Sequence, residues 1–422
     1  MHRIGRATAA FAVTVALATQ VAACAGTAVA SAGPTGGGAT PVAIPSADGA
    51  TSPQPPIRVS APPTFGPSPT PAPGLARLQP ASGAYFGLNL DWGHETAQQA
   101  SEALGRTPAV WVQFARFPMD DGTRANVEAF IEQVEGVHGM ALLTLEPEDG
   151  LAAVTDAAAA DLGDLLARAW DEHGVATFVR FAHEMNGSWY PWAQRPSAYI
   201  AAFRRVAAAV HQRSPSSAML WAPNQGAGYT FKGGTYAASP GSADAIALDT
   251  NGDGKVDAAD DPYAPYYPGD DAVDWIGVSL YHWGLAYPWG ENELPRPRTF
   301  EELLRGVDTG AQAGAKAVPD LYATYADGHD KPLAIVETAI LYDPAARKGP
   351  SETQLKTAWF DEVFSDRTRS EFPRIGMINW FEWRKRESEV GKVIDWRLAA
   401  DPALARSLLD ETPPGWLRFA SS

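Results

Sequence analysis

The chain has 422 residues, of which 49 are Asp or Glu and 33 are Lys or Arg, so it carries a formal net charge of −16 at neutral pH. A chain this acidic lacks the basic surface on which nucleic-acid binding depends, which argues against a nucleic-acid partner. Its eight His residues include no H-E-x-x-H pair, so the sequence gives no sign of a catalytic zinc site.

The first 23 residues have the pattern of a secretion signal. A short basic start precedes an apolar stretch, residues 7–23, that is too short to span a bilayer comfortably. The stretch ends in Val-Ala-Ala-Cys, which resembles a bacterial lipobox, and Cys24 is the only cysteine of the chain. We therefore expect residues 1–23 to be removed and Cys24 to be lipidated on the outer face of the cell membrane. Cleavage at a later Ala-rich site, giving a secreted protein, is the alternative.

Residues 24–80 consist mostly of Gly, Pro, Ser, Thr and Ala. Such a segment cannot bury enough apolar surface to offset its conformational entropy, so we interpret it as an extended tether. Residues 81–418 are rich in aromatic and apolar side chains without a second linker, which predicts one large domain. A long tether also favours a monomer.

Eight short apolar runs of β type recur from residue 85 onward and alternate with amphipathic stretches of helical period. The runs are residues 85–92, 109–117, 139–147, 176–184, 217–224, 274–283, 332–340 and 374–383. The clearest helical stretches are residues 94–105, 124–137, 157–174, 196–213 and 352–364. This pattern predicts an α/β protein with a (β/α)8 (TIM) barrel, whose active site is built at the C-terminal ends of the strands.

Glutamates stand at or near the ends of several of these runs. Glu184 ends the fourth run and Glu337 lies near the end of the seventh, so a barrel brings them to opposite sides of one mouth. Two carboxyl groups facing each other are the machinery of glycoside hydrolysis, and a separation of about 5–5.5 Å gives retention of configuration. The loop after Glu184 is rich in Trp, whose flat faces suit the C–H faces of sugar rings. Glu146, which ends the third run, either lines the cleft or caps the following helix.

The segment from Arg180 to Trp189, R-x-x-H-E-M-N-G-x-W, resembles the acid/base motif of glycoside hydrolase family 26. The resemblance extends in strand order over about residues 82–415, and it implies a retaining endo-β-glycanase. It assigns Glu184 as acid/base and Glu337 as nucleophile. Family members act foremost on β-1,4-mannan, and others act on mixed-linkage β-glucan or xylan.

The same resemblance, together with position in the barrel, suggests further site residues. The substrate-binding candidates are Arg180, His183, Asn186, Trp189, Tyr281, Trp283 and Trp380, with Trp192 as a further sugar platform. Tyr281 matches the tyrosine that contacts the nucleophile, and Trp380 matches the strand-eight tryptophan beneath the sugar. The loop after the fourth run, Ser-Trp-Tyr-Pro-Trp, departs from the more continuous aromatic run of typical mannanases, so mannan specificity stays open.

Residues 249–260 follow the ligand spacing of an EF-hand loop. Oxygen-bearing side chains occupy positions 1, 3, 5, 9 and 12, position 6 is Gly, and position 7 would offer a backbone oxygen. The corresponding residues are Asp249, Asn251, Asp253, Asp257, Asp260, Gly254 and Lys255. The loop resembles a single dockerin repeat, and we expect it to bind a structural Ca²⁺, with no cofactor needed for catalysis.

The sequence therefore favours a retaining endo-β-glycanase acting on β-mannan or glucomannan. Two other enzymatic readings stay open, a mixed-linkage β-1,3-1,4-glucanase and a hydrolase of a cell-envelope glycan. A glycan-binding lipoprotein without catalysis is the alternative from another class, as is a scaffold that docks through the calcium loop. Neither non-enzymatic reading explains why two carboxylates are paired at the predicted mouth of the barrel.

Overall fold

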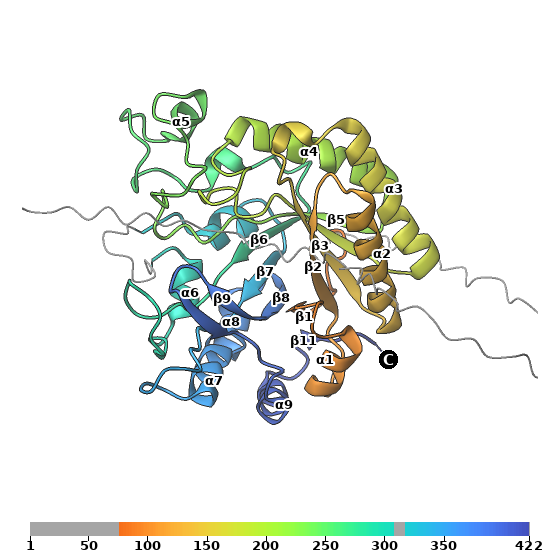
Figure 1. Cartoon of the computed structure of the whole chain (residues 1–422), viewed down its shortest axis with the longest axis vertical. Coiled ribbons are helices and arrows are strands. Elements are labelled where there is room, and N and C mark those ends of the chain that lie inside the picture. Colours follow the sequence, from red (N-terminus) through yellow and green to blue (C-terminus); the bar gives the residue numbers. More distant parts are fainter. Residues whose placement is uncertain (1–75, 308–316, 422) are drawn as a thin grey trace, which may run out of the picture. The chain divides into compact units, whose positions relative to one another are not determined.

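The computed structural model describes residues 76–307 and 317–421, so the predicted signal peptide, Cys24 and nearly all of the predicted tether lie outside the described residues. Within these ranges, eight parallel strands form a closed barrel, because each strand pairs with the next along the chain and β8 pairs with β1 (Figure 1). The strands are β1 (Ala84–Leu90), β2 (Val110–Arg116), β3 (Met140–Glu146), β4 (Thr177–Phe181), β5 (Ser217–Trp221), β6 (Trp275–Ser279), β7 (Leu333–Thr338) and β8 (Ile375–Glu382). The predicted (β/α)8 fold is confirmed, and each predicted β run overlaps one strand.

Helices lie outside the barrel. The five predicted helical stretches are present as α1 (Ala97–Leu104), α2 (Asp121–Gly136), α3 (Asp156–His173), α4 (Pro196–Arg213) and α7 (Glu352–Val363). The elements that the sequence pattern did not single out are α5 (Ala243–Leu248), α6 (Thr299–Leu304), α8 (Asp366–Glu371), α9 (Pro402–Glu411), η1 (Leu151–Ala153), η2 (Ala264–Tyr266) and the π-helical turn η3 (Tyr322–Asp327). Most of these span six residues or fewer, which is too short to display a helical period.

Hydroxyl and carboxylate caps mark where α1, α2, α3 and α7 begin. The side chains of Thr96, Asp120, Thr155 and Ser351 each accept a hydrogen bond from the backbone N–H three residues later. These bonds satisfy donors that the first turn of a helix leaves free. The caps thus set the lengths of the loops that enter α1, α2, α3 and α7.

Alternation along each strand divides the buried side chains into two layers. One layer fills the barrel, with Val112, Leu142, Phe178, Leu220 and Val336 among its members. The other layer packs between the strands and the helices and is larger. A residue's parity on its strand therefore decides whether its side chain points into the barrel, toward the mouth, or outward among the helices.

The N-terminal ends of the strands are closed by the two ends of the described chain. Trp275, the first residue of β6, donates from Nε1 to the carbonyl oxygen of Arg77 at 2.7 Å, and Leu78 packs against the interior layer. The short strand β11 (Leu417–Arg418) pairs in parallel with the start of β1. Both ends of the described domain therefore lie at the face opposite the carboxyl ends of the strands.

The chain after β8 forms a hairpin, β9 (Arg384–Glu387) and β10 (Lys392–Asp395), joined by antiparallel pairing. It follows directly from the carboxyl end of a barrel strand, so it lies beside the mouth. None of the helices in the described ranges has the length and apolar character needed to cross a membrane.

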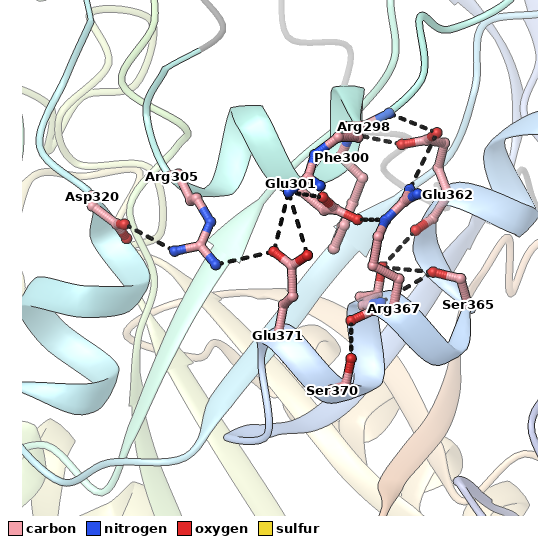
Figure 2. Close-up of polar contacts among 11 residues, drawn as sticks. Arg298, Phe300, Glu301, Arg305, Asp320, Glu362, Ser365, Arg367, Ser370 and Glu371 are labelled. Atoms are coloured by element: carbon pink, nitrogen blue, oxygen red, sulfur yellow. Dashed lines mark hydrogen bonds and ion pairs between the residues drawn. The ribbon is translucent and has the colours of Figure 1, made fainter.

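A set of ion pairs joins α6, α7 and α8 on the outside of the barrel (Figure 2). We call it the α6–α8 ion cluster, and its members are Arg298, Glu301, Arg305, Asp320, Glu362, Arg367 and Glu371. Glu301 is fully buried and contacts Arg298 at 2.7 Å and also Arg367. Arg305 contacts Glu371 at 3.2 Å and Asp320 at 3.6 Å, which ties the segment before η3 to α8.

Candidate active site

Glu337 lies near the end of β7 and is held by two donors. Arg180 Nη1 donates to its Oε1, and the Tyr281 hydroxyl donates to its Oε2 at 2.6 Å. Arg180 is fully buried, and its Nη2 donates to Ser279 Oγ at 2.8 Å, so the guanidinium plane is fixed on two sides. Hydrogen bonds from a cation and a phenol stabilise the ionised form of a carboxyl group, which suits a nucleophile.

Glu184 stands three residues beyond the last residue of β4, in a turn of unusual backbone conformation. Ala182 and Glu184 have positive φ angles of 47° and 53°, a region that costs free energy for residues other than Gly and that persists only where neighbours enforce it. The backbone N–H of Glu184 donates to the carbonyl oxygen of Ala222 at 2.9 Å, which ties this turn to the end of β5. The carboxyl group accepts from Trp189 Nε1 at 3.1 Å.

Burial, and after it the negative charge of Glu337, raise the pKa of Glu184 to about 7. Arg180 and hydrogen bonds from Ser279 and Trp189 act in the opposite direction. A large fraction of the Glu184 carboxyl groups therefore keeps the proton near pH 7, whereas the Glu337 carboxylate is bonded to the Arg180 cation. Such divergent environments for two carboxyl groups are the mark of an acid and a nucleophile.

Glu146, at the end of β3, is a third acid of the same site. Its pKa is raised to about 7, mainly by burial and by the charge of Glu148, with contributions from Glu337 and Glu184. The following helix α3 is capped by Thr155, so Glu146 does not serve as its cap. Of the two readings that the sequence left open, the cleft-lining one fits these surroundings. We call Glu146, Arg180, Glu184 and Glu337 the carboxyl cluster.

His183 is buried beside the carboxyl cluster in the neutral form. Its pKa lies well below the usual value because of burial and the nearby charge of Arg180. Its Nε2 lies 3.1 Å from the hydroxyl of Tyr190, and its ring packs against Tyr190 and Phe114 at centroid distances of 4.8 and 5.5 Å. Tyr190 in turn stacks on Trp192 at 4.4 Å. These contacts hold the turn that carries Glu184.

The structure contradicts the assignment of Trp380 as a sugar platform. Its side chain is fully buried, packs near Phe360 of α7, and donates from Nε1 to the carbonyl oxygen of Trp396 at 2.9 Å. Met377 belongs to the layer inside the barrel, so Trp380, three residues further along β8, has the opposite parity and points toward the helices. The strand-eight aromatics near the mouth are Phe381 and Trp383, which stack at 6.0 Å.

Two further predicted contact residues are also turned away from the cleft. Asn186 is fully buried, and its amide forms two hydrogen bonds with the backbone of Asn224, at 2.8 and 2.9 Å. Trp192 is only 1 % exposed and donates from Nε1 to the carbonyl oxygen of His183. Both side chains brace the loop after β4 and offer no face to a ligand.

The remaining predicted aromatic residues are partly exposed. Trp189 donates a hydrogen bond to Glu184, and its ring packs edge-on against that of Phe231 at a centroid distance of 5.1 Å. Trp189 therefore lies beside Glu184 and also positions its carboxyl group. Trp283 contacts Tyr281 at 6.2 Å and Trp396 at 5.0 Å.

Sequence reasoning missed three participants in the site: Ser279, Trp383 and Trp396. Ser279 lies two residues before Tyr281 with the same strand parity, a signal that could have identified it. Trp396, only 1 % exposed, packs edge-on against Tyr281 at 5.3 Å and donates from Nε1 to Glu387 at 2.7 Å. It reaches the site through the hairpin, and nothing in the local pattern marks it.

The predicted calcium loop is folded around its own acidic side chains. Asp249 accepts from the backbone N–H groups of Asp253 and Gly254 at 3.0 and 2.7 Å, and Asp260 accepts from that of Asp257 at 2.8 Å. Gly254 has a φ of 85°, the left-handed conformation that glycine adopts without strain. Across the described residues, no group of three or more His, Cys, Asp or Glu side chains is arranged to hold a metal ion. Calcium binding stays a prediction.

The described residues thus define a (β/α)8 barrel with three carboxyl groups around one buried arginine at its mouth. No protein-family model matches the chain. A curated relative, Endoglucanase H of Acetivibrio thermocellus, is 23% identical over 237 residues, which cover 54% of this chain and 19% of that protein. The chain therefore spans about a fifth of the length of this relative.

Solved structures similar to this chain are glycoside hydrolase barrels. An endo-β-1,4-mannanase of Cellulomonas fimi aligns with a TM-score of 0.48 and 17% identity, covering 81% of this chain and 73% of that one. The glycoside hydrolase family 26 domain of an endo-β-mannanase/endo-β-glucanase from Prevotella bryantii aligns with a TM-score of 0.45 and 9% identity, covering 81% and 91%.

Proposed function

We propose that this protein is a retaining endo-β-glycanase. One observation carries the proposal: Glu337 accepts hydrogen bonds from Arg180 and Tyr281, while Glu184 beside it has a pKa raised to about 7. A retaining glycosidase requires these two states in one site, a carboxylate that attacks and a carboxylic acid that gives up its proton. The sequence pointed to both residues on two independent grounds. They lie at or near the ends of two facing strands, and they match a family motif.

In the first step, Glu184 donates its proton to the glycosidic oxygen as that oxygen leaves the anomeric carbon, and a Glu337 oxygen bonds to the same carbon. Formation of the ester removes the negative charge of Glu337. Because this charge raises the pKa of Glu184, its loss lowers that pKa and prepares Glu184 to act as a base. Glu184 then takes a proton from water, whose oxygen displaces Glu337 and restores both groups.

The polymer we propose first is β-1,4-mannan or glucomannan, and a mixed-linkage β-glucan or an envelope glycan is the alternative. The resemblance of the Arg180–Trp189 motif supports mannan. The similarity to a protein named an endoglucanase and to one named an endo-β-mannanase/endo-β-glucanase supports keeping both backbones under test.

The proposal is tested by incubating the purified protein and its Glu337→Ala variant with β-mannan, glucomannan, mixed-linkage β-glucan and xylan, and by measuring the reducing ends released. We expect release from one or more polymers by the wild type alone. Proton NMR of the first product should show the β-anomer. Equal release by the variant, or release of the α-anomer, would contradict the assignment; binding without release would favour the non-catalytic alternative.

We also propose that Ca²⁺ binds residues 249–260 and stabilises this insertion without taking part in turnover. Five oxygen-bearing side chains at EF-hand spacing and a left-handed Gly254 support it. At a concentration ten times its Kd, Ca²⁺ adds about 1.4 kcal/mol to the free energy of unfolding. Adding EDTA should therefore lower the Tm by a few degrees. An unchanged Tm, or an equal change in an Asp249→Ala/Asp260→Ala variant, would argue against the site.

The location that we propose is the outer face of the cell membrane, with the catalytic domain a monomer held through lipidated Cys24. The Val-Ala-Ala-Cys sequence before a long Pro-rich segment supports it. A Cys24→Ala variant expressed in a bacterial host should move from the membrane fraction to the soluble fraction. Retention of the variant in the membrane would count against lipidation.

A further inference from the structure

A line of four aromatic rings leads away from the nucleophile. It starts at Tyr281, which donates to Glu337, and continues through Trp283 and Trp289 to Tyr287. The successive ring centroids are 6.2, 5.6 and 5.2 Å apart. We call these four residues the aromatic line. Since each ring contacts the next, the line forms one continuous apolar border from the site to the end of the loop after β6.

The line becomes more exposed with distance from Glu337. Trp283 and Trp289 are partly exposed, and Tyr287 is 45% exposed. Tyr287 is the one aromatic residue among the large apolar side chains that are exposed in residues 76–307 and 317–421. Because Tyr287 contacts Trp289 and Trp289 contacts Trp283, the three rings form one contiguous apolar surface, and a contiguous surface of this kind is typical of a ligand-binding groove.

The loop that carries the outer half of the line is fastened at three points. Glu293 accepts from the backbone N–H of Leu285 at 2.7 Å, and Lys392 of β10 donates to the carbonyl oxygen of Gly290 at 2.6 Å. The amide of Asn292 exchanges hydrogen bonds with the backbone of Asp343 at 2.8 and 3.2 Å. The rings are therefore held in place before any ligand arrives, which reduces the entropy that binding has to overcome.

The inner half of the line is also supported from behind. Trp396 packs edge-on against Trp283 at 5.0 Å, and its own Nε1–H donates to Glu387. Trp283 and Trp289 are inclined by only 34° to each other, so they offer two similarly oriented faces. A chain of pyranose rings has apolar C–H faces that can lie on such surfaces, whereas its hydroxyl groups stay in water.

From this geometry we infer that Trp289 and Tyr287 form a distal sugar-binding subsite, which holds a β-glycan chain beyond the units bound at Glu184 and Glu337. The inference rests on the proposed function, since it requires a polymer in the cleft. Its consequence is selectivity for length: a long chain reaches the subsite, and a short substrate does not. The occupant is a neutral stretch of the same polysaccharide that is cleaved.

The subsite is tested with a Trp289→Ala/Tyr287→Ala double variant on the best polymer and on an aryl β-disaccharide of the same sugar. We expect kcat/KM on the polymer to fall about tenfold, which corresponds to the loss of one to two aromatic contacts. We expect kcat/KM on the disaccharide to stay unchanged. Leu294→Ala is the matched control, because Leu294 lies in the same loop, is 41% exposed and stands outside the line. Equal losses on both substrates, or none on either, would overturn the inference.

Binding separates this inference from the proposed function. In affinity electrophoresis through gels that contain each of the four polymers, the wild type and Leu294→Ala should be retarded by at least one polymer, and the double variant less. Retardation that depends on the two rings in a protein that releases no sugar would support the subsite and reject the glycanase. Equal retardation of the double variant and the wild type, or no retardation of any form, would reject the subsite.

Discussion

The carboxyl cluster and the α6–α8 ion cluster are both assemblies of acidic side chains and arginines, yet they differ in the balance of charge. Three carboxyl groups share one guanidinium in the carboxyl cluster. In the ion cluster, three arginines serve four carboxylates, and each of those carboxylates has an arginine within 4 Å (Figure 2). Burial raises the pKa of Glu184 and of Glu146 to about 7, and the single guanidinium nearby offsets only part of that rise.

The comparison teaches that burial alone does not make an acid useful for catalysis. Glu301 is as deeply buried as any residue of the site, but its carboxylate contacts two arginines, Arg298 and Arg367. Glu184 lies near one arginine, Arg180, whose guanidinium is already bonded to Glu337, and the pKa of Glu184 stays raised. We expect substitutions in the first cluster to change activity and substitutions in the second to change stability.

The largest expected effect comes from Glu337→Gln. Loss of the nucleophile should reduce kcat/KM by on the order of 10⁴-fold or more, because no covalent intermediate can form. The matched control is Glu371→Gln, which removes a carboxylate from the ion cluster and should leave kcat/KM within a factor of two or so. Similar losses in the two variants would erase the distinction between the clusters.

Arg180→Met should have the next largest effect. The variant leaves the Glu337 carboxylate buried without its cation and frees the Glu337 and Ser279 side chains to move, so we expect kcat to fall about a hundredfold. Arg180→Lys retains the positive charge but not the planar guanidinium with its paired donors, so its kcat should fall less than that of Arg180→Met. Steady-state kinetics on the preferred polymer would measure both. If the Arg180→Lys and Arg180→Met variants had the same kcat, the positive charge of Arg180 would not be what supports catalysis.

Glu301→Gln should act on stability alone. It removes the central anion of the ion cluster while Arg298 and Arg367 keep some access to water, so we expect a loss of about 2 kcal/mol in the free energy of unfolding. Urea denaturation would measure the loss, and kcat should be unchanged. Asp330→Asn, at a pair whose carboxylate side chain is 85% exposed, is the control and should change neither quantity. A fall in kcat with full stability would contradict the prediction.

Trp189→Phe should shift the pH profile by a small amount. Glu184 must be protonated to act, so kcat/KM should fall as the pH rises above about 7. The hydrogen bond from Trp189 lowers the pKa of Glu184, so its removal should raise that pKa and move the alkaline limb to higher pH, by less than about one unit. A shift to lower pH would mean that Trp189 acts mainly by other contacts.

The fold and the central pair were predictable because both depend on short-range pattern. Alternating β and α runs indicated the barrel, and strand ends brought Arg180, Glu184, Tyr281 and Glu337 to one place. Trp380 was assigned as a sugar platform from the resemblance alone. Alternation along β8, counted from Met377, would have predicted that its side chain points outward toward the helices. Trp383 lies an even number of residues after Met377, so the same alternation would have predicted that its side chain points toward the mouth.

The other misassignments arose where the chain leaves regular structure. The positive φ angles of Ala182 and Glu184 end the alternation of β4, so the direction of Asn186 does not follow from its spacing. Trp396 and Trp289 reach the neighbourhood of Tyr281 through a hairpin and a loop whose course is set by tertiary contacts such as that of Lys392 with Gly290. Local propensity carries no information about such contacts.

The closure of the barrel at its N-terminal face has a practical consequence. Arg77 and β11 both lie at that face, so a tag or a chemical linkage added at either end of the described domain would emerge on the side away from Glu184 and Glu337. A bead-immobilised form would present its mouth to the solution. Macromolecules too large to enter the gap between protein and support would still reach the mouth, which makes either end suitable for attachment to an insoluble matrix.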